Sequence, residues 1–170
     1  MESEESIKYM DREFFDIETY ALFSALNEII GEKTWDIVLR GGEYAFAEIK
    51  RRHGITEKDP IALVKRLGKW LQEMGYARIK IEQTGENEFL YHMYDTASRR
   101  GLRQIRKEKG EDAVMAHWST AIMFAALKEM CNTKAEISHL EFAKEDTKGA
   151  SVEKWILSKI ESREKIEVGE

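Results

Sequence analysis

Hydrophobic residues recur every three or four positions through most of the first 75 residues, which is the spacing of amphipathic helices. The pattern predicts helices over residues 11–30 and 34–54, with Thr34 as the N-cap of the second. A third helix is predicted over 60–74. Asp59 is a favourable N-cap residue, and Pro60, the only proline in the chain, suits the first helical position.

Two adjacent glycines, Gly41 and Gly42, lie on the apolar face of the second predicted helix. Each costs about 1 kcal/mol relative to alanine in a helix interior, so the pair needs a structural reason. The bare backbone allows close approach either of another helix or of a ligand. We favour helix packing and keep ligand contact as the alternative.

The hydrophobic period then changes from 3.6 to 2. Residues 76–83 alternate apolar and polar side chains, and residues 88–94 form a second extended segment after the turn TGEN, which together predict a hairpin. A third strand is predicted over 134–143. Its apolar positions shift in parity between Ile137 and Leu140, which indicates a β-bulge.

The segment AHWSTAIMFAALKEMC, residues 116–131, is apolar on nearly every side and predicts a buried helix. The uncharged run 113–127 has 15 residues, fewer than the roughly 20 that cross a bilayer, so we expect no membrane span. A short basic helix is predicted around Leu102 and Ile105. The last patterned segment, 151–161, fits either a helix or an edge strand.

Helices followed by strands indicate an α+β fold in which helices pack on one face of an antiparallel sheet. With 170 residues, 42% of them hydrophobic, we expect a single domain over 1–170 with its core over about 11–158. The net charge of -5 gives no general attraction to nucleic acid or anionic membrane. The lone Cys131 cannot form an internal disulfide, and the acidic start lacks a secretory pattern, so we expect a cytoplasmic protein.

The sequence contains no nucleophile elbow, phosphate-binding loop, dinucleotide fingerprint or paired-carboxylate motif. The four histidines, His53, His92, His117 and His139, lack the spacing of a metal-binding helix. We therefore predict no catalytic residue, no metal site and no cofactor. These absences favour a binding protein over an enzyme.

Four stretches carry a family resemblance: GGEYAFAEIKRRHG, GKWLQEMGYARIKIEQ, YHMYDTASRRG and the segment 117–157. In this order they resemble the 4-vinyl-reductase-like domains, often called hydrocarbon-binding proteins, whose fold is shared with TRAPP subunits and with haem nitric-oxide sensors. The resemblance implies a TRAPP-like, nitric-oxide-sensor-like ligand-binding fold. It also implies that residues 148–157 form the closing strand.

The chain departs from the family pattern at two places. Many members carry paired cysteines around a glycine near the C-terminal end, whereas here Glu145 and Glu153 flank Gly149. Since structural zinc sites prefer thiolate and imidazole ligands, we expect no zinc. The segment YDTASR does not match the Tyr-x-Ser-x-Arg motif of the haem sensors, so we expect no haem.

The predicted ligand site collects rings from the third helix, the hairpin and the start of the buried helix: Trp70, His92, Tyr94, His117 and Trp118. Pockets for small apolar molecules are lined mainly by aromatic and aliphatic groups, with a few polar groups that fix orientation. The resemblance implies that His92 or Tyr94 orients a polar group of the ligand. The alternative is that these side chains, His117 included, are ordinary core residues.

Six cations lie within residues 99–109. Among them Arg99, Arg100 and Arg103 form a predicted patch for an anion or an acidic partner, with a solvated surface as the alternative.

Taken together, the sequence predicts a sensor or carrier module that holds a small apolar molecule between its helices and its sheet, near the hairpin, and that forms a homodimer. The first alternative is a non-enzymatic assembly subunit with a filled core. An enzyme of cofactor metabolism and a nucleic-acid binder are the remaining alternatives, the latter resting only on the basic segment.

Overall fold

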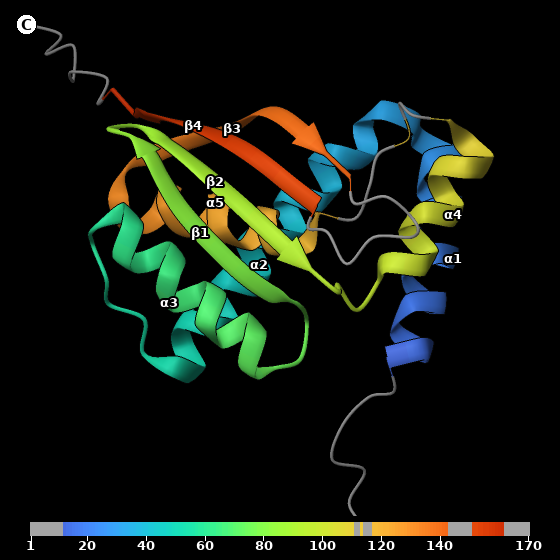
Figure 1. Cartoon of the computed structure of the whole chain (residues 1–170), viewed down its shortest axis with the longest axis horizontal. Coiled ribbons are helices and arrows are strands. Elements are labelled where there is room, and N and C mark those ends of the chain that lie inside the picture. Colours follow the sequence, from blue (N-terminus) through green and yellow to red (C-terminus); the bar gives the residue numbers. More distant parts are fainter. Residues whose placement is uncertain (1–11, 111–112, 114–116, 143–150, 162–170) are drawn as a thin grey trace, which may run out of the picture.

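The described part of the chain comprises residues 12–110, 113, 117–142 and 151–161, and it contains ten helices and strands in the computed structural model (Figure 1). These are α1 (Arg12–Ile30), the short 3-10 helix η1 (Gly31–Lys33), α2 (Thr34–His53), α3 (Pro60–Glu73), β1 (Arg78–Gly85), β2 (Glu88–Tyr94), α4 (Arg99–Lys109), α5 (Trp118–Cys131), β3 (Thr133–Glu141) and β4 (Ser151–Lys159).

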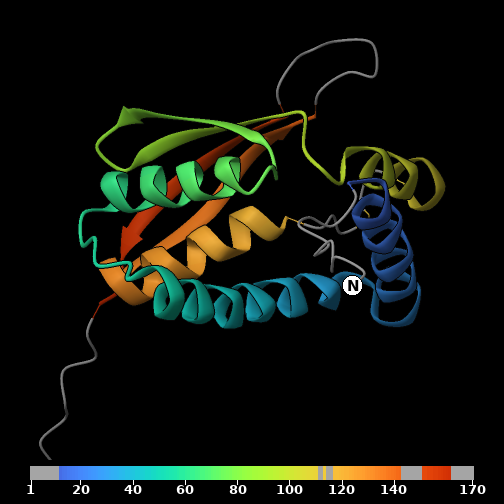
Figure 2. The same cartoon turned by 90° about the horizontal axis from the view of Figure 1, so that it is seen from below.

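The four strands form one antiparallel sheet in the order β1-β2-β4-β3. Helices α3 and α5 pack on one face of this sheet, and α2 packs on the far side of α5 (Figure 2). The hydrophobic core lies between the sheet and these helices. This architecture confirms the predicted α+β fold with helices on one face of an antiparallel sheet.

Helices α2 and α5 approach each other closely at the glycine pair. A Cβ atom added to Gly42 would lie 2.5 Å from the backbone carbonyl of Ala121, and one added to Gly41 would lie 2.9 Å from the ring of Trp118. Both separations are too short for non-bonded carbon atoms. Packing against a helix therefore explains the pair, as we favoured from the sequence.

The start of α3 follows the prediction, because the Asp59 carboxylate accepts a hydrogen bond from the Ala62 amide at 2.9 Å. The prediction for α2 was wrong in one detail. Lys33, not Thr34, occupies the cap position, because η1 runs directly into α2 with helical backbone angles. Gly54 ends α2 in the left-handed conformation with φ of 60°, as a glycine stop does.

The sheet confirms the hairpin and the bulge. Pairing between β3 and β4 shifts register between Ile137 and His139, so that Leu140 returns to the inner face opposite Glu153. The segment that fitted either a helix or a strand is the strand β4, as the resemblance implied.

Helix α5 begins at Trp118, and eleven of its fourteen residues are buried. Its predicted first residue, Ala116, lies outside the described residues. The helix ends at Cys131, and the next residue, Asn132, has a φ of 50° and turns the chain directly into β3. No helix among the described residues has both the length and the hydrophobicity that a membrane span needs.

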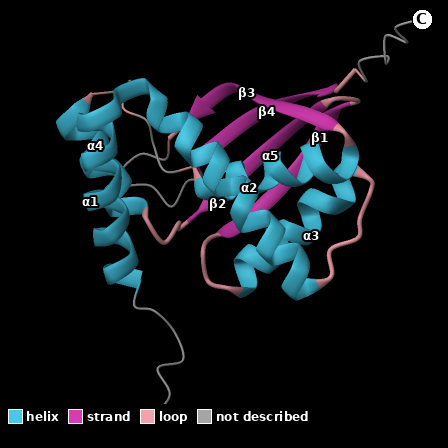
Figure 3. Ribbon diagram, turned by 180° about the vertical axis from the view of Figure 1, so that it is seen from behind, coloured by secondary structure: helices cyan, strands magenta, loops and turns pink. Residues whose placement is uncertain are grey.

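Helices α1 and α4 lie side by side at one end of the molecule, beyond the ends of the strands (Figures 1 and 3). The amide of Gly101 donates to Asp16 Oδ1 at 2.8 Å. A Cβ atom at Gly101 would lie 2.6 Å from the Asp16 carbonyl oxygen, so glycine allows the two helices to meet. Phe23 and Ile105 form the centre of a second, smaller core there.

Candidate functional site

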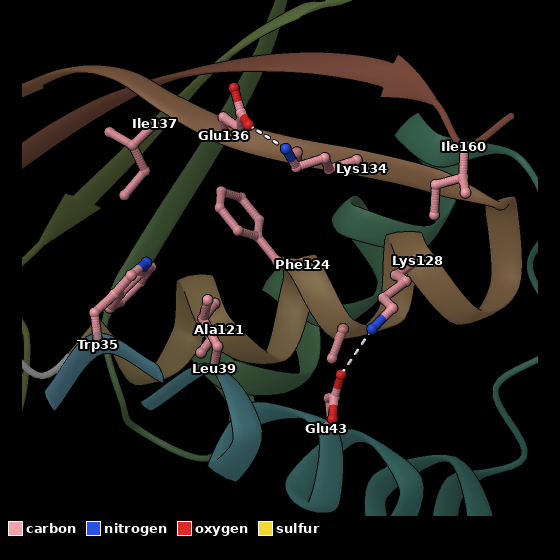
Figure 4. Close-up of a pocket in the computed structure, with 12 residues that line it drawn as sticks. Trp35, Leu39, Glu43, Ala121, Phe124, Lys128, Lys134, Glu136, Ile137 and Ile160 are labelled. Atoms are coloured by element: carbon pink, nitrogen blue, oxygen red, sulfur yellow. Dashed lines mark hydrogen bonds and ion pairs between the residues drawn. The ribbon is translucent and has the colours of Figure 1, made fainter. Parts of the chain in front are cut away.

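An apolar groove with a volume of about 700 Å³ lies between α2, α5 and the edge strand β3 (Figure 4). Its apolar lining residues come from these three elements and from the end of the sheet: Trp35, Leu39, Ala121, Phe124, Ala125, Ala135, Ile137 and Ile160. Pockets for small ligands typically have volumes of roughly 300–1,000 Å³ and mainly apolar walls. The groove therefore has the size and lining of a site for a small apolar molecule.

The sequence of α5 leaves room for this groove. Ala121 and Ala125 are four residues apart, so they lie on one face of the helix. Their short side chains fill little of the space beside that face. The ring of Phe124 projects beside them toward β3, while Trp35 stands at one end of the groove and Ile160 at the other (Figure 4). The groove thus keeps its space because alanines, not leucines, line its α5 wall.

Charged side chains stand at the mouth of the groove. Lys128 Nζ lies 3.0 Å from Glu43 Oε1, and Lys134 pairs with Glu136 on the edge strand (Figure 4). The hydrogen bond from Lys128, and after it the one from Arg40, lowers the pKa of Glu43. The mouth therefore presents both signs of charge at neutral pH, beside an apolar floor.

Glu153 forms a buried polar centre next to the groove. Its side chain is fully buried and accepts from the Thr120 hydroxyl at 2.8 Å and from Trp155 Nε1 at 2.7 Å, while His117 Nδ1 lies 2.8 Å from the other carboxylate oxygen. These partners satisfy a carboxylate that would otherwise be very costly to bury. We call these four residues the Glu153 cluster.

His117 links the Glu153 cluster to the groove. An ionised carboxylate only accepts hydrogen bonds, so His117 Nδ1 is the donor in this contact. The His117 ring also packs edge-on against Trp35 at 5.7 Å between ring centres. The cluster thus holds the His117 ring in place, and that ring supports Trp35 at the end of the groove.

Further hydroxyl groups lie buried behind the Glu153 cluster. Burial raises the pKa of the Tyr91 hydroxyl well above its ordinary value and also raises the pKa of the Tyr76 hydroxyl. Both hydroxyls therefore stay protonated at neutral pH. Within the described residues, the hydroxyls of Tyr91 and Ser98 have no hydrogen-bond partner. Ser119, which is close enough to Tyr91 to lower its pKa, directs its hydroxyl at Met93 Sδ, 3.5 Å away.

Two of the predicted ligand residues, His117 and Trp118, lie together at the start of α5. His117 belongs to the Glu153 cluster, and its side chain is only 13% exposed. Trp118 packs edge-on against Phe23, with 5.4 Å between ring centres, and fills the space above Gly41. Trp118 is therefore part of the core between α1, α2 and α5. Neither His117 nor Trp118 lines the groove directly.

The structure places His92 and Tyr94 on the outer face of the sheet, away from the helices. Side chains alternate along β2, and the inner face is taken by Tyr91 and Met93, which belong to the core. His92 and Tyr94 stack on each other instead, with 6.4 Å between ring centres. The predicted arrangement, in which they meet His117 and Trp118 in one pocket, is therefore corrected.

Trp70 is also separate from the groove, because it lies on α3 and packs beside His53 at 5.7 Å. The space between α5 and the hairpin, where the ligand was expected, is occupied by buried side chains that include Phe89, Tyr91 and Met123. The hollow lies instead on the other side of α5, against β3.

The predicted anion patch lies at the α1/α4 end. Arg99, Arg100 and Arg103 line a hollow of about 420 Å³ together with Arg12. Three carboxylates share this lining, from Glu13, Asp16 and Asp95. The negative groups offset much of the positive charge, so the lining does not favour a free anion.

No group of three or more His, Cys, Asp or Glu side chains in the described segments is arranged to hold a metal ion. Of the two carboxylates considered for zinc, Glu145 lies outside the described residues. Glu153 is turned inward and hydrogen-bonded to its three partners.

Sequence reasoning missed both Glu153 as a buried centre and the groove. The alternation of Glu153, Trp155 and Leu157 was a usable signal, because in a strand these positions share one face, and two of them are large and apolar. No comparable signal existed for Trp35 and Ile137, which line one groove although about 100 positions separate them in the chain.

Comparison with known proteins shows similarity in fold. No protein-family profile and no curated protein sequence matches the chain. Its structure is similar to the phenol-responsive sensory domain of the transcription activator PoxR in its crystal structure with phenol. That match has a TM-score of 0.59 at 11% identity and covers 83% of this chain and 74% of that chain.

The structure is also similar to an Fe(II) unliganded H-NOX protein variant from K. algicida. The TM-score is 0.56 at 21% identity, and the match covers 96% of this chain and 82% of that chain. At these identities the likeness concerns the fold alone. It agrees with the predicted nitric-oxide-sensor-like fold, while membership of the 4-vinyl-reductase-like family stays a prediction.

Proposed function

We propose that this protein is a small-molecule-binding sensor or carrier module that holds a small, largely apolar molecule in the groove between α2, α5 and β3. The observation that carries the proposal is the groove itself, with about 700 Å³ of space against apolar side chains. The fold shared with a phenol-responsive sensory domain and with an H-NOX protein supports a sensor role. The resemblance to hydrocarbon-binding proteins supports an apolar ligand.

The lining sets the chemistry of the ligand. Trp35 and Phe124 offer ring faces and edges to an aromatic or long aliphatic body. Lys128 and Glu43 at the mouth can each orient one polar substituent. A ligand with an apolar body and one polar end therefore fits best, and fatty acids, phenols and polyaromatic hydrocarbons are suitable probes.

The first experiment is native mass spectrometry of the purified chain beside a denatured control, followed by thermal unfolding with each probe class. We expect either a co-purified mass or stabilisation by at least one class, because a ligand that binds only the folded state at 100 times its Kd adds about 2.7 kcal/mol. A clean mass without stabilisation by any class contradicts the proposal and favours an assembly subunit.

A matched pair of variants then tests the location. Ile137→Glu places a carboxylate in the wall of the groove, while Ile156→Glu makes the same change on the outer face of the neighbouring strand β4. We expect the first to weaken binding of the active probe roughly tenfold or more, because burying a charge beside an apolar ligand is costly. The second should leave binding unchanged. Equal effects would place the ligand elsewhere.

A further inference from the structure

The mouth of the groove carries a network of three charged side chains in which cations outnumber carboxylates. Glu43 on α2 accepts a hydrogen bond from Lys128 on α5 at 3.0 Å and another from Arg40, one turn before it on α2. Glu43 is 34% exposed, whereas the side chain of Lys128 is 63% exposed. The network therefore has a single positive charge in excess at neutral pH, beside the apolar floor of the groove.

Lys128 can leave this network without stranding a charge. Arg40 donates to Oε2 of Glu43, while Lys128 donates to Oε1, so Glu43 keeps one cationic partner when Lys128 turns to another anion. On the strand side of the mouth, Lys134 pairs with Glu136, which has no second cation at ion-pair distance within the described residues. Lys128 is therefore the cation that a ligand can recruit at least cost.

The charged end and the aromatic end of the groove lie apart. The Ile160 amide donates to the Asn132 carbonyl at 3.0 Å, and Lys128 precedes Asn132 by one helical turn, so Lys128 lies at the Ile160 end. Trp35 stands at the other end, beyond Ala121 (Figure 4). The stretch of α5 from Ala121 to Lys128 is about 10 Å long at 1.5 Å per residue. The groove thus suits a body of medium length with one charged end.

We propose that the ligand of this groove is a monocarboxylate with a medium-length alkyl or aryl body, and that its carboxylate takes Lys128 from Glu43. This inference rests on the proposed function, since it names the ligand class of the same groove. The body then lies along α5, beside Phe124 and toward Trp35. Glu43 stays paired with Arg40, so every charge keeps a partner. An amine in the same place would meet the excess positive charge of the network, which opposes a cationic ligand.

Three probes with the same alkyl chain separate the head group from the body: decanoate, decanol and decylamine. Isothermal titration calorimetry of the full chain at neutral pH, with each probe below its micelle concentration, measures their affinities. We expect decanoate to bind with a single molecule per chain, about fivefold more tightly than decanol, and decylamine to bind most weakly. High salt should weaken the binding of decanoate but not of decanol, because the ion pair at the mouth is screened.

Variants of the charged residues then locate the carboxylate. Lys128→Gln should weaken decanoate binding about fivefold and leave decanol binding unchanged. Its matched control is Lys50→Gln, which should change neither, because Lys50 pairs with Glu129 across the same two helices, at 2.7 Å, without lining the groove. Lys134→Gln should weaken decanoate binding less than Lys128→Gln does. Glu43→Gln should instead tighten decanoate binding about twofold or more, since it frees Lys128 and removes a like charge.

The outcomes distinguish this inference from the proposed function. Decanol that binds as tightly as decanoate would overturn the carboxylate assignment but leave an apolar ligand in the groove. A loss for Lys134→Gln or Lys50→Gln as large as that for Lys128→Gln would overturn the assigned partner. Binding of phenols or polyaromatic hydrocarbons alone would refute the ligand class, whereas failure of every class contradicts the proposed function as well. The side chains of Lys128 and Lys134 are each 63% exposed, so we expect their variants to fold.

Discussion

Nδ1 of His117 lies 2.8 Å from Oε1 of Glu153, and this contact joins the start of α5 to the second central strand of the sheet. Thr120 and Trp155 complete the carboxylate's hydrogen bonds from the same two elements. The Glu153 cluster therefore fixes how α5 sits on the sheet. Since Trp35 packs on His117, it also fixes one end of the groove.

Replacing Glu153 by alanine should lower the free energy of unfolding by about 3–5 kcal/mol, because three donors, two of them fully buried, lose their acceptor at once. Urea denaturation followed by circular dichroism measures the loss. Glu153→Gln keeps the shape and one acceptor oxygen, so its loss should be smaller. Lys154→Ala, at the neighbouring position on the outer face, is the control. A loss below about 1 kcal/mol for Glu153→Ala would contradict the assigned role.

Alanine at Gly42 should also destabilise the protein, by roughly 1–3 kcal/mol, through overpacking against α5. The new Cβ would meet the Ala121 backbone, which cannot move aside without shifting the helix. At Gly41 the new Cβ would meet only the end of the Trp118 ring, which can rotate, so the loss there should be smaller. Thermal unfolding of the two variants gives the order, and a larger loss at Gly41 would be inconsistent with this packing.

Much of the fold was predictable because its signals are local. Asp59 and Pro60 mark the start of α3 within two residues, and the alternation that predicts β1 needs only eight. The shift in parity between Ile137 and Leu140 likewise reports the bulge directly. Each of these signals depends on a short stretch whose own geometry fixes the outcome.

The site was less predictable because its parts come from distant segments. Rings alone suggested a pocket at His92 and Tyr94, but only the register of the sheet decides which face of β2 they occupy. The groove depends on how far β3 stands from α2, a distance that neither segment encodes alone.

Cys131 should react slowly with iodoacetamide while the protein is folded. Burial raises the pKa of its thiol, and only the thiolate attacks, so the reactive fraction falls at any given pH below that pKa. We expect alkylation at pH 8 to be at least about tenfold slower than for glutathione, and to become comparable in 8 M urea, an accessible denaturing concentration. Mass spectrometry follows the adduct. Equal rates for the native protein and glutathione would show that the thiol is accessible.

Glu48 should titrate far below an ordinary glutamate. Arg51 donates two hydrogen bonds to its carboxylate, at 2.6 and 2.8 Å, and Arg52 donates a third, so its pKa falls from 4.5 to about 2. The folded pKa lies below the unfolded one, so this group stabilises the fold fully above the unfolded pKa. The contribution is lost as the pH falls from there to about 2.

Titration of the Glu48 side-chain carboxyl by NMR tests this directly. Arg51→Gln should raise the midpoint, because the bidentate partner is the largest cause of the shift, whereas Lys58→Gln, which removes an exposed cation beyond the end of α2, should not. High salt should raise the midpoint as well, since the pair is solvent-exposed and screened. A midpoint near 4.5 in the wild type would mean that the arginine hydrogen bonds do not persist in solution, and the acid sensitivity ascribed to this turn of α2 would then have another source.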